Sequence, residues 1–156
     1  MNQVPGEPES IHAAEKPMHL RPALIGLVIV GGTLGTAARE ALSLTIAPLG
    51  SFPLAIFLIN VAGAFALGLL LERLVHDGPG ATMRRNARLL AGTGFLGGFT
   101  TYSALATDTD LLLRAGEVST GILYAVGTLL LGLVAAWAGI VLGGSARRGG
   151  TQAADA

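Results

Sequence analysis

The chain has 156 residues, of which 51% are hydrophobic and only 13% are charged, and its mean hydropathy is +0.62. A soluble domain carries about twice that charged fraction and could not cover so much apolar surface with its own core, so a soluble fold is excluded. The formal net charge of zero, the lack of a basic run and the absence of cysteine exclude a nucleic-acid partner, disulfides and thiolate metal sites.

The predicted elements follow the charge-free stretches of the chain. Residues 1–20 are polar and lack the basic-then-apolar order of a signal peptide, so we expect a disordered cytoplasmic tail. Each later stretch supplies the ~20 apolar residues that a membrane-spanning helix needs. We therefore predict an all-α membrane protein with one transmembrane domain at 21–144, a disordered tail at 145–156, and four transmembrane helices near 21–46, 52–75, 86–107 and 118–143.

The connections between these helices differ in length and charge. The first is a tight turn around Pro48, Gly50 and Pro53. Eight of the ten Lys and Arg residues fall on one side of the predicted membrane, in the two tails and the second connection. By the positive-inside rule, both termini are expected to be cytoplasmic, in a multi-pass protein of the plasma membrane.

The third predicted span is rich in glycine and hydroxyl side chains. Gly92, Gly94 and Gly97 match G-x-G-x-x-G, but the dinucleotide fingerprint requires a preceding strand and a βαβ unit, which an apolar span does not offer. Four glycines in the seven positions 92–98 weaken a helix, so we predict a broken membrane helix whose unwound backbone contacts ions. The alternative is a glycine-rich packing seam with hydroxyls bonded to their own helix.

Two polar side chains in the first two spans are further candidates. Asn60 lies in the middle of the second span, where its amide NH₂ offers two donors to a small anion. The alternative is a hydrogen bond that joins two helices. Arg39 lies near the end of the first span, where a cation attracts anions, or where its side chain extends to the interface.

Small residues and a short polar stripe complete the candidates. Gly31 with Gly35, and Gly139 with Gly143, form G-x-x-x-G pairs that predict close helix packing. Tyr124 and Thr128 lie one turn apart and form a polar stripe on the fourth span. The three histidines, His12, His19 and His76, show no metal-ligand spacing. We expect no enzyme activity.

Together these segments resemble the CrcB/Fluc family of fluoride channels over roughly residues 22–143. The resemblance rests on three motifs in order: Gly31-Gly32-x-x-Gly35-x-x-x-Arg39, Asn60-Val61-x-Gly63-x-Phe65-x-x-Gly68, and Gly94-Phe95-x-Gly97-Gly98-Phe99-Thr100-Thr101-Tyr102-Ser103.

The resemblance implies a passive fluoride channel that exports fluoride, built from two subunits packed antiparallel in the bilayer. It implies a structural sodium ion, held between the subunits by backbone carbonyls at the helix break, for which Gly97, Thr100 and Gly98 are the candidates. It also implies a fluoride pathway lined by Asn60, Phe99, Thr101, Tyr102, Ser103, Tyr124 and Thr128, with Arg39 drawing anions toward it.

The sequence departs from the family pattern at one place. The family usually has Thr-Thr-Phe-Ser-Thr-Phe where this chain reads Thr100-Thr101-Tyr102-Ser103-Ala104-Leu105, so one aromatic ring and one hydroxyl are absent. The strong charge bias favours one orientation in the membrane, so the chain is not expected to insert in both. Both features suggest the hypothesis that the chain pairs with a different, oppositely oriented homologue. The rival interpretations are a four-helix multidrug exporter, for which Glu40 is the one candidate proton-coupling acid, and a non-transporting membrane assembly subunit.

Overall fold

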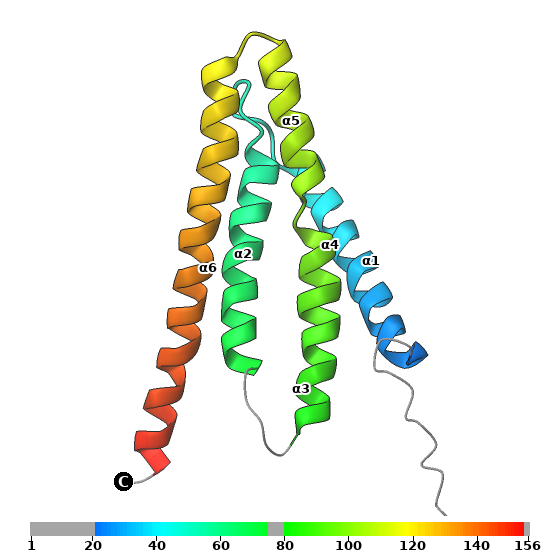
Figure 1. Cartoon of the computed structure of the whole chain (residues 1–156), viewed down its shortest axis with the longest axis vertical. Helices are drawn as coiled ribbons and strands as arrows, with labels where there is room; N and C mark the ends of the chain where they lie inside the picture. Colours follow the sequence, from blue (N-terminus) through cyan, green and yellow to red (C-terminus); the bar gives the residue numbers. More distant parts are fainter. Residues whose placement is uncertain (1–20, 75–79, 155–156) are drawn as a thin grey trace, which may run out of the picture.

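The computed structural model describes residues 21–74 and 80–154, with side-chain surroundings given as far as Ser145. Within these ranges the chain is nearly all helical (Figure 1). The tail predicted at 1–20, His12, His19 and His76 lie outside the described residues.

The first two helices match the predicted spans closely. Helix α1 covers Pro22–Thr45 and starts with a proline at its first position, where the missing N–H costs nothing. Helix α2 covers Leu54–Leu74. The predicted turn between them is confirmed: Leu49 and Phe52 exchange two backbone hydrogen bonds of 3.0 and 3.1 Å, and Gly50 takes a φ of 64°.

The third segment is longer than predicted, and it is broken within the predicted Gly/Thr-rich stretch. It consists of α3 (Ala81–Ala87), the π-helix η2 (Arg88–Leu96), the single turn α4 (Gly97–Phe99) and α5 (Tyr102–Arg114), in place of one span at 86–107. The break lies at Thr100 (ψ 155°) and Thr101 (φ −150°), which are extended, whereas the glycines that precede them are helical.

Several glycines of the bundle lie where neighbouring backbone occupies the space that a side chain would need. A Cβ on Gly31 would collide with the Leu90 carbonyl, and one on Gly35 with the Phe95 carbonyl. On the other side of the bundle, a Cβ on Gly139 would collide with the Phe65 carbonyl. Both predicted G-x-x-x-G pairs therefore lie at close helix contacts, α1 against η2 and α2 against α6 (Val118–Ala154).

Helix α6 continues past its predicted end at 143, so the segment predicted as a disordered tail after 144 is helical as far as Ala154. No proline interrupts this segment, and it contains alanines, which favour helix. Near the predicted end, α6 still packs on α2: a Cβ added to Gly143 would lie 2.8 Å from the Cβ of Glu72.

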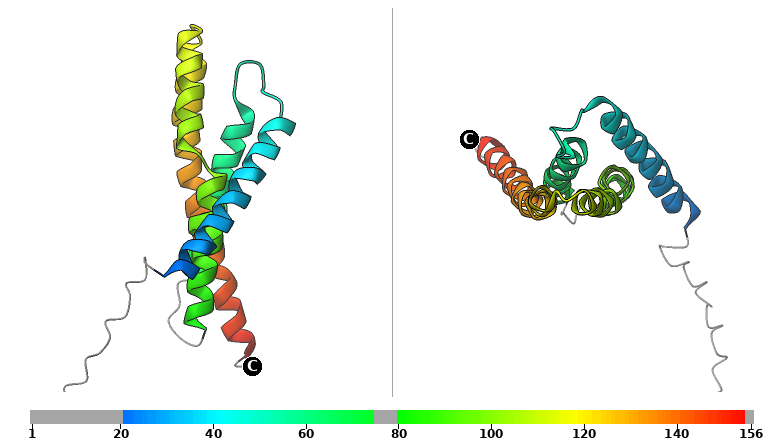
Figure 2. Two further views of the ribbon diagram at one scale, coloured as in Figure 1. Left: turned by 90° about the vertical axis from the view of Figure 1, so that its right-hand side faces the viewer. Right: turned by 90° about the horizontal axis from the view of Figure 1, so that it is seen from above.

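The surface of this bundle is suited to lipid. Three described helices are long and apolar enough to cross a membrane: Pro22–Thr45, Leu54–Leu74 and Val118–Ser145, with hydropathies of 1.4, 2.5 and 2.2. Large apolar side chains such as Leu44 and Leu133 are 80% and 70% exposed, whereas few are buried. An apolar surface of this extent indicates a membrane protein. Figure 1 shows α1 and α6 diverging toward the end of the bundle that carries α3, and the view from above in Figure 2 shows α2 and the third segment between them.

Candidate functional site

The helix break is built from two threonines with different tasks. Thr100 Oγ1 donates to the Leu96 carbonyl at 2.9 Å, and its backbone N–H donates to the same carbonyl at 3.0 Å, so it closes the end of α4. Thr101 is the N-cap of α5, where its hydroxyl oxygen accepts a 3.2 Å hydrogen bond from the Ala104 N–H. Two consecutive threonines thus end one helix and start the next.

Asn60 holds the break from the facing helix α2. Its Oδ1 accepts from the Thr101 N–H at 2.8 Å, and its Nδ2 donates to the Thr101 carbonyl at 3.0 Å. One carboxamide therefore satisfies both backbone polar groups of the extended residue, as a neighbouring strand would. This confirms the interhelical bond considered for Asn60, and it leaves the second Nδ2 hydrogen free of that pairing.

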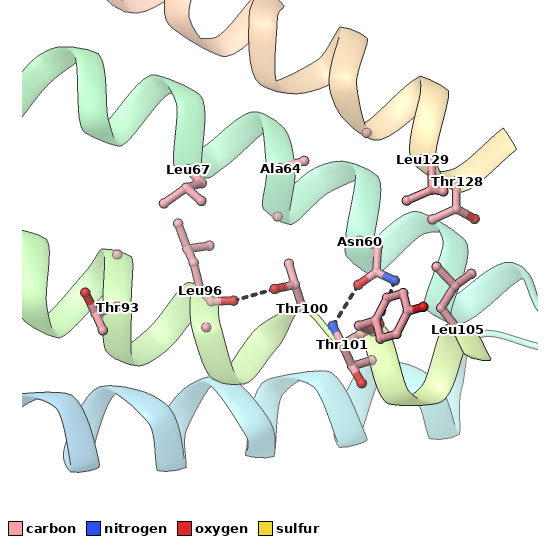
Figure 3. A pocket seen from close by; sticks show the side chains of 15 residues that line it. Asn60, Ala64, Leu67, Thr93, Leu96, Thr100, Thr101, Leu105, Thr128 and Leu129 are labelled. Atoms are coloured by element: carbon pink, nitrogen blue, oxygen red, sulfur yellow. Dashed lines mark hydrogen bonds between the residues drawn. The ribbon is translucent and has the colours of Figure 1, made fainter. Parts of the chain in front are cut away.

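A cavity of about 420 Å³ lies beside the break, between α2, the third segment and α6 (Figure 3). Its polar lining is formed by Asn60, Thr93, Thr100, Thr101, Tyr102 and Thr128. Its apolar lining includes Leu67, Leu96, Leu105 and Leu129. The cavity opens onto the apolar surface of the chain, where Tyr102 is 78% and Leu129 60% exposed. Uncharged donors in an apolar wall suit a small ion that must leave water.

Most of the residues predicted for the site lie at this cavity. Asn60, Thr101, Tyr102 and Thr128 line it, and Ser103 adjoins it through a 3.1 Å contact between its hydroxyl and that of Thr101. The hydroxyl of Thr128 donates to the Tyr124 carbonyl at 2.6 Å, so its proton is directed along its own helix.

Tyr124 is fully buried and does not line this cavity. Its hydroxyl donates to Asp108 Oδ2 at 3.0 Å, and its ring meets Phe52 edge-on with centroids 5.4 Å apart. Together with Leu105 and Leu112 it forms the core that joins α5 to α6. The sequence placed Tyr124 and Thr128 on one polar stripe, but the Tyr124 hydroxyl bonds to Asp108 and the Thr128 hydroxyl bonds to its own helix.

Phe99 also lies outside the cavity lining. Its ring stacks on Phe95 with centroids 5.8 Å apart, and a Cβ on Gly63 would lie 3.4 Å from its ring. Phe99 therefore fills the space between the third segment and α2.

Arg39 reaches the C-terminal end of α4. Its Nε donates to the Gly98 carbonyl at 3.4 Å, and Thr36 Oγ1 donates to the same oxygen at the same distance. The last carbonyls of a helix carry partial negative charge, so a guanidinium there is stabilising. Arg39 and Gly98 are thus brought together on the α1 side of the break, away from the cavity.

Thr93 is a cavity residue that sequence reasoning missed. It is exposed, it lies in η2 between two glycines, and it lines the same cavity as Asn60, toward the other end (Figure 3). The available signal was a single hydroxyl in an apolar span, which is weak on its own because threonine often bonds back to its own helix.

The comparison with known proteins points to one family. Residues 26–140 match the family model described as "CrcB-like protein, Camphor Resistance (CrcB)". A protein of Leifsonia xyli named fluoride-specific ion channel FluC 2 is 53% identical over 135 residues, which cover 85% of this chain and 93% of that protein.

Two further relatives carry corresponding names. Fluoride-specific ion channel FluC 1 of Cutibacterium acnes is 43% identical, over 75% of this chain and 82% of its own length. Fluoride-specific ion channel FluC of Thermus thermophilus is 44% identical, over 76% of this chain and 94% of its own length. The chain therefore belongs to the CrcB-like family.

Proposed function

We propose that this chain is a subunit of a passive fluoride-selective channel that lowers cytoplasmic fluoride by letting the ion leave the cell. The observation that carries the proposal is Asn60, whose amide lines a cavity at a helix break within an apolar bundle. The names of the relatives in the CrcB-like family support the choice of ion. As a channel subunit, the chain performs no catalysis.

The donors at the break suit fluoride, a small and tightly hydrated anion. After pairing with Thr101, the Asn60 amide has one N–H left to donate. Thr101 and Ser103 share one hydroxyl proton between them, and the other is available to an ion. These donors replace water without a fixed positive charge that would trap the anion, and the Tyr102 ring adds an electropositive edge.

We propose that the segment formed by η2, α4 and α5, third in chain order, also crosses the membrane and so completes a set of four transmembrane helices. Its break lies within the bilayer, and irregular backbone there requires protein around it. Asn60 covers one side of the break, while the cavity opens onto the surface of the chain. We propose that a second subunit, packed in the opposite orientation, closes the cavity and completes the pathway.

The charge bias supports pairing with an oppositely oriented homologue. Eight of the ten basic residues lie in the tails and the second connection, which favours one orientation with both termini in the cytoplasm. Leu105 strengthens this proposal, because the position that carries an aromatic ring in the family is here part of a buried core with Tyr124.

A structural sodium ion at the break is part of the same proposal, with Gly97 and Thr100 as carbonyl ligands. The usual helical donor to the Gly97 carbonyl is the Thr101 N–H, which instead donates to Asn60. Backbone carbonyls are hard oxygen ligands that suit sodium. Gly98 fits less well, because its carbonyl accepts from the Arg39 guanidinium, which would repel a second cation.

The sodium proposal is tested by the assembly of the subunits. The dimer fraction of the purified channel, measured by light scattering, should fall when sodium is replaced by N-methylglucamine at equal ionic strength. An unchanged dimer fraction would refute a structural role for sodium.

The function is tested by fluoride efflux from liposomes, followed with a fluoride electrode while a potassium ionophore balances the movement of charge. We expect efflux of fluoride and retention of chloride when this chain is reconstituted with an oppositely biased homologue. Robust flux from the lone chain, with terminal tags found on both sides of the membrane, would refute the heterodimer. An absence of flux in both preparations would refute the channel and favour an assembly subunit.

A further inference from the structure

One end of the bundle carries a concentration of arginines. Helix α2 ends next to Arg73, α3 carries Arg84 and Arg85, and η2 begins at Arg88. Figure 1 shows the end of α2 and the start of α3 at the same end of the bundle, opposite the α5–α6 connection. We call these four residues the basic face.

Three of these arginines start from one side of the same helical segment, where Arg88 is exposed and Arg84 and Arg85 are half-buried. Arg88 keeps helical dihedrals, with φ −63° and ψ −40°, so the spacing continues from α3 into η2. At about 100° per residue, positions 84, 85 and 88 fall within an arc of about 100°. Arg88 is exposed, and a Cβ on Gly80 would lie 3.5 Å from Arg84 Nη1, so that guanidinium is turned toward the outer end of α3.

The position of the basic face relative to the membrane can be inferred from the residues that follow Arg88. Residues 89–107 carry no charge, so the apolar part of the third segment begins directly after Arg88. We therefore expect the guanidinium groups to lie at the level of lipid headgroups. Among the described residues of this end, Glu72 is the only acidic side chain of α2, α3 and η2, whereas Asp108, Asp110 and Glu117 lie at the opposite end.

We propose that Arg73, Arg84, Arg85 and Arg88 bind the phosphate group of an anionic phospholipid. The planar guanidinium presents paired donors that match phosphate oxygens, and an anionic headgroup such as phosphatidylglycerol adds a charge that phosphatidylcholine does not have. Bound lipid stabilises the end of the bundle at which α1 splays from α6. This site is separate from the cavity beside Asn60.

The test measures which lipid stays with the protein. The purified chain is exchanged in mixed micelles of equimolar phosphatidylglycerol and phosphatidylcholine, and retained lipid is quantified by mass spectrometry. The double variant Arg73→Gln/Arg88→Gln should lower the retained ratio by about fivefold per arginine removed. Arg114→Gln is the matched control, because Arg114 is an exposed arginine at the opposite end, and it should leave the ratio unchanged.

Three further measurements distinguish paired hydrogen bonding from charge alone, a folding defect from lost binding, and a lipid site from a free-anion site. The variant Arg73→Lys/Arg88→Lys keeps the charge and loses the paired donors, so its ratio should lie between those of the wild type and the glutamine variant. Gel filtration confirms that each variant is folded, independently of fluoride flux. An equal ratio in the glutamine variant and in Arg114→Gln would overturn the proposal, as would displacement of the lipid by millimolar inorganic phosphate, which would indicate a free-anion site.

Discussion

The carboxamide of Asn60 pairs with both backbone polar groups of Thr101, accepting from its N–H at 2.8 Å and donating to its carbonyl at 3.0 Å. This pairing gives one residue two roles. Asn60 stabilises the extended backbone between α4 and α5, and it presents its remaining N–H to the cavity. Structure and permeation are therefore coupled at this position.

Changing Asn60 to Asp should affect both roles. Asp lacks the NH₂ group, so an oxygen would face the Thr101 carbonyl and leave it without its donor, at a cost of about 1–3 kcal/mol. We expect fluoride efflux to fall to the background of empty liposomes and the unfolding free energy to decrease. The same change at Asn86, which lies on α3 and does not line the cavity, is the matched control and should preserve flux. Normal efflux in Asn60→Asp would remove Asn60 from the pathway.

Two variants test the role of Thr101 as the N-cap of α5. Thr101→Val keeps the shape and removes the hydroxyl that accepts from the Ala104 N–H, so stability should fall by about 1 kcal/mol. Thr101→Ser keeps the hydroxyl and should stay close to wild type in stability and in fluoride efflux. Equal stability of the two variants, measured by unfolding in mixed micelles, would show that the cap does not hold the start of α5.

Two glycines of α1 give a direct test of close helix packing. Gly35→Ala places a methyl group against the Phe95 carbonyl and should destabilise the fold by about 1–3 kcal/mol, because α1 must move away from η2. A methyl group added at Gly26 would meet nothing within 4 Å, so Gly26→Ala should be neutral or stabilise by up to about 1 kcal/mol. Thermal unfolding followed by circular dichroism compares the two. Equal effects would contradict the α1–η2 contact.

Tyr124→Phe should lower stability and spare permeation. The hydroxyl donates to Asp108 away from the cavity lining, so its loss removes a part-buried hydrogen bond worth about 1–2 kcal/mol. We expect fluoride efflux per folded channel to remain near wild type. A loss of efflux at unchanged stability would place the Tyr124 hydroxyl on the fluoride pathway, as the family resemblance implied.

Local patterns were sufficient to predict the spans and the packing glycines. Apolar runs of suitable length predicted α1, α2 and α6, because a helix in lipid must satisfy its own backbone and present apolar side chains. The G-x-x-x-G spacing predicted the contacts of Gly31 and Gly35, since residues four apart share a helix face. The same reasoning placed Asn60 in the middle of an apolar span, where an amide requires a partner.

The partners of these polar groups depended on the tertiary structure. The predicted Gly/Thr-rich stretch contains the break, but no local rule indicated that Asn60 would pair with Thr101, 41 positions away. Gly94 and Gly98 lie against α1, where a Cβ would collide with the backbone of Gly31 and Gly32. Tyr124 lies in a core, where it contacts Asp108 and Phe52. Spacing along the chain indicates which residues share a helix face, but the packing of helices far apart in sequence determines which groups that face contacts.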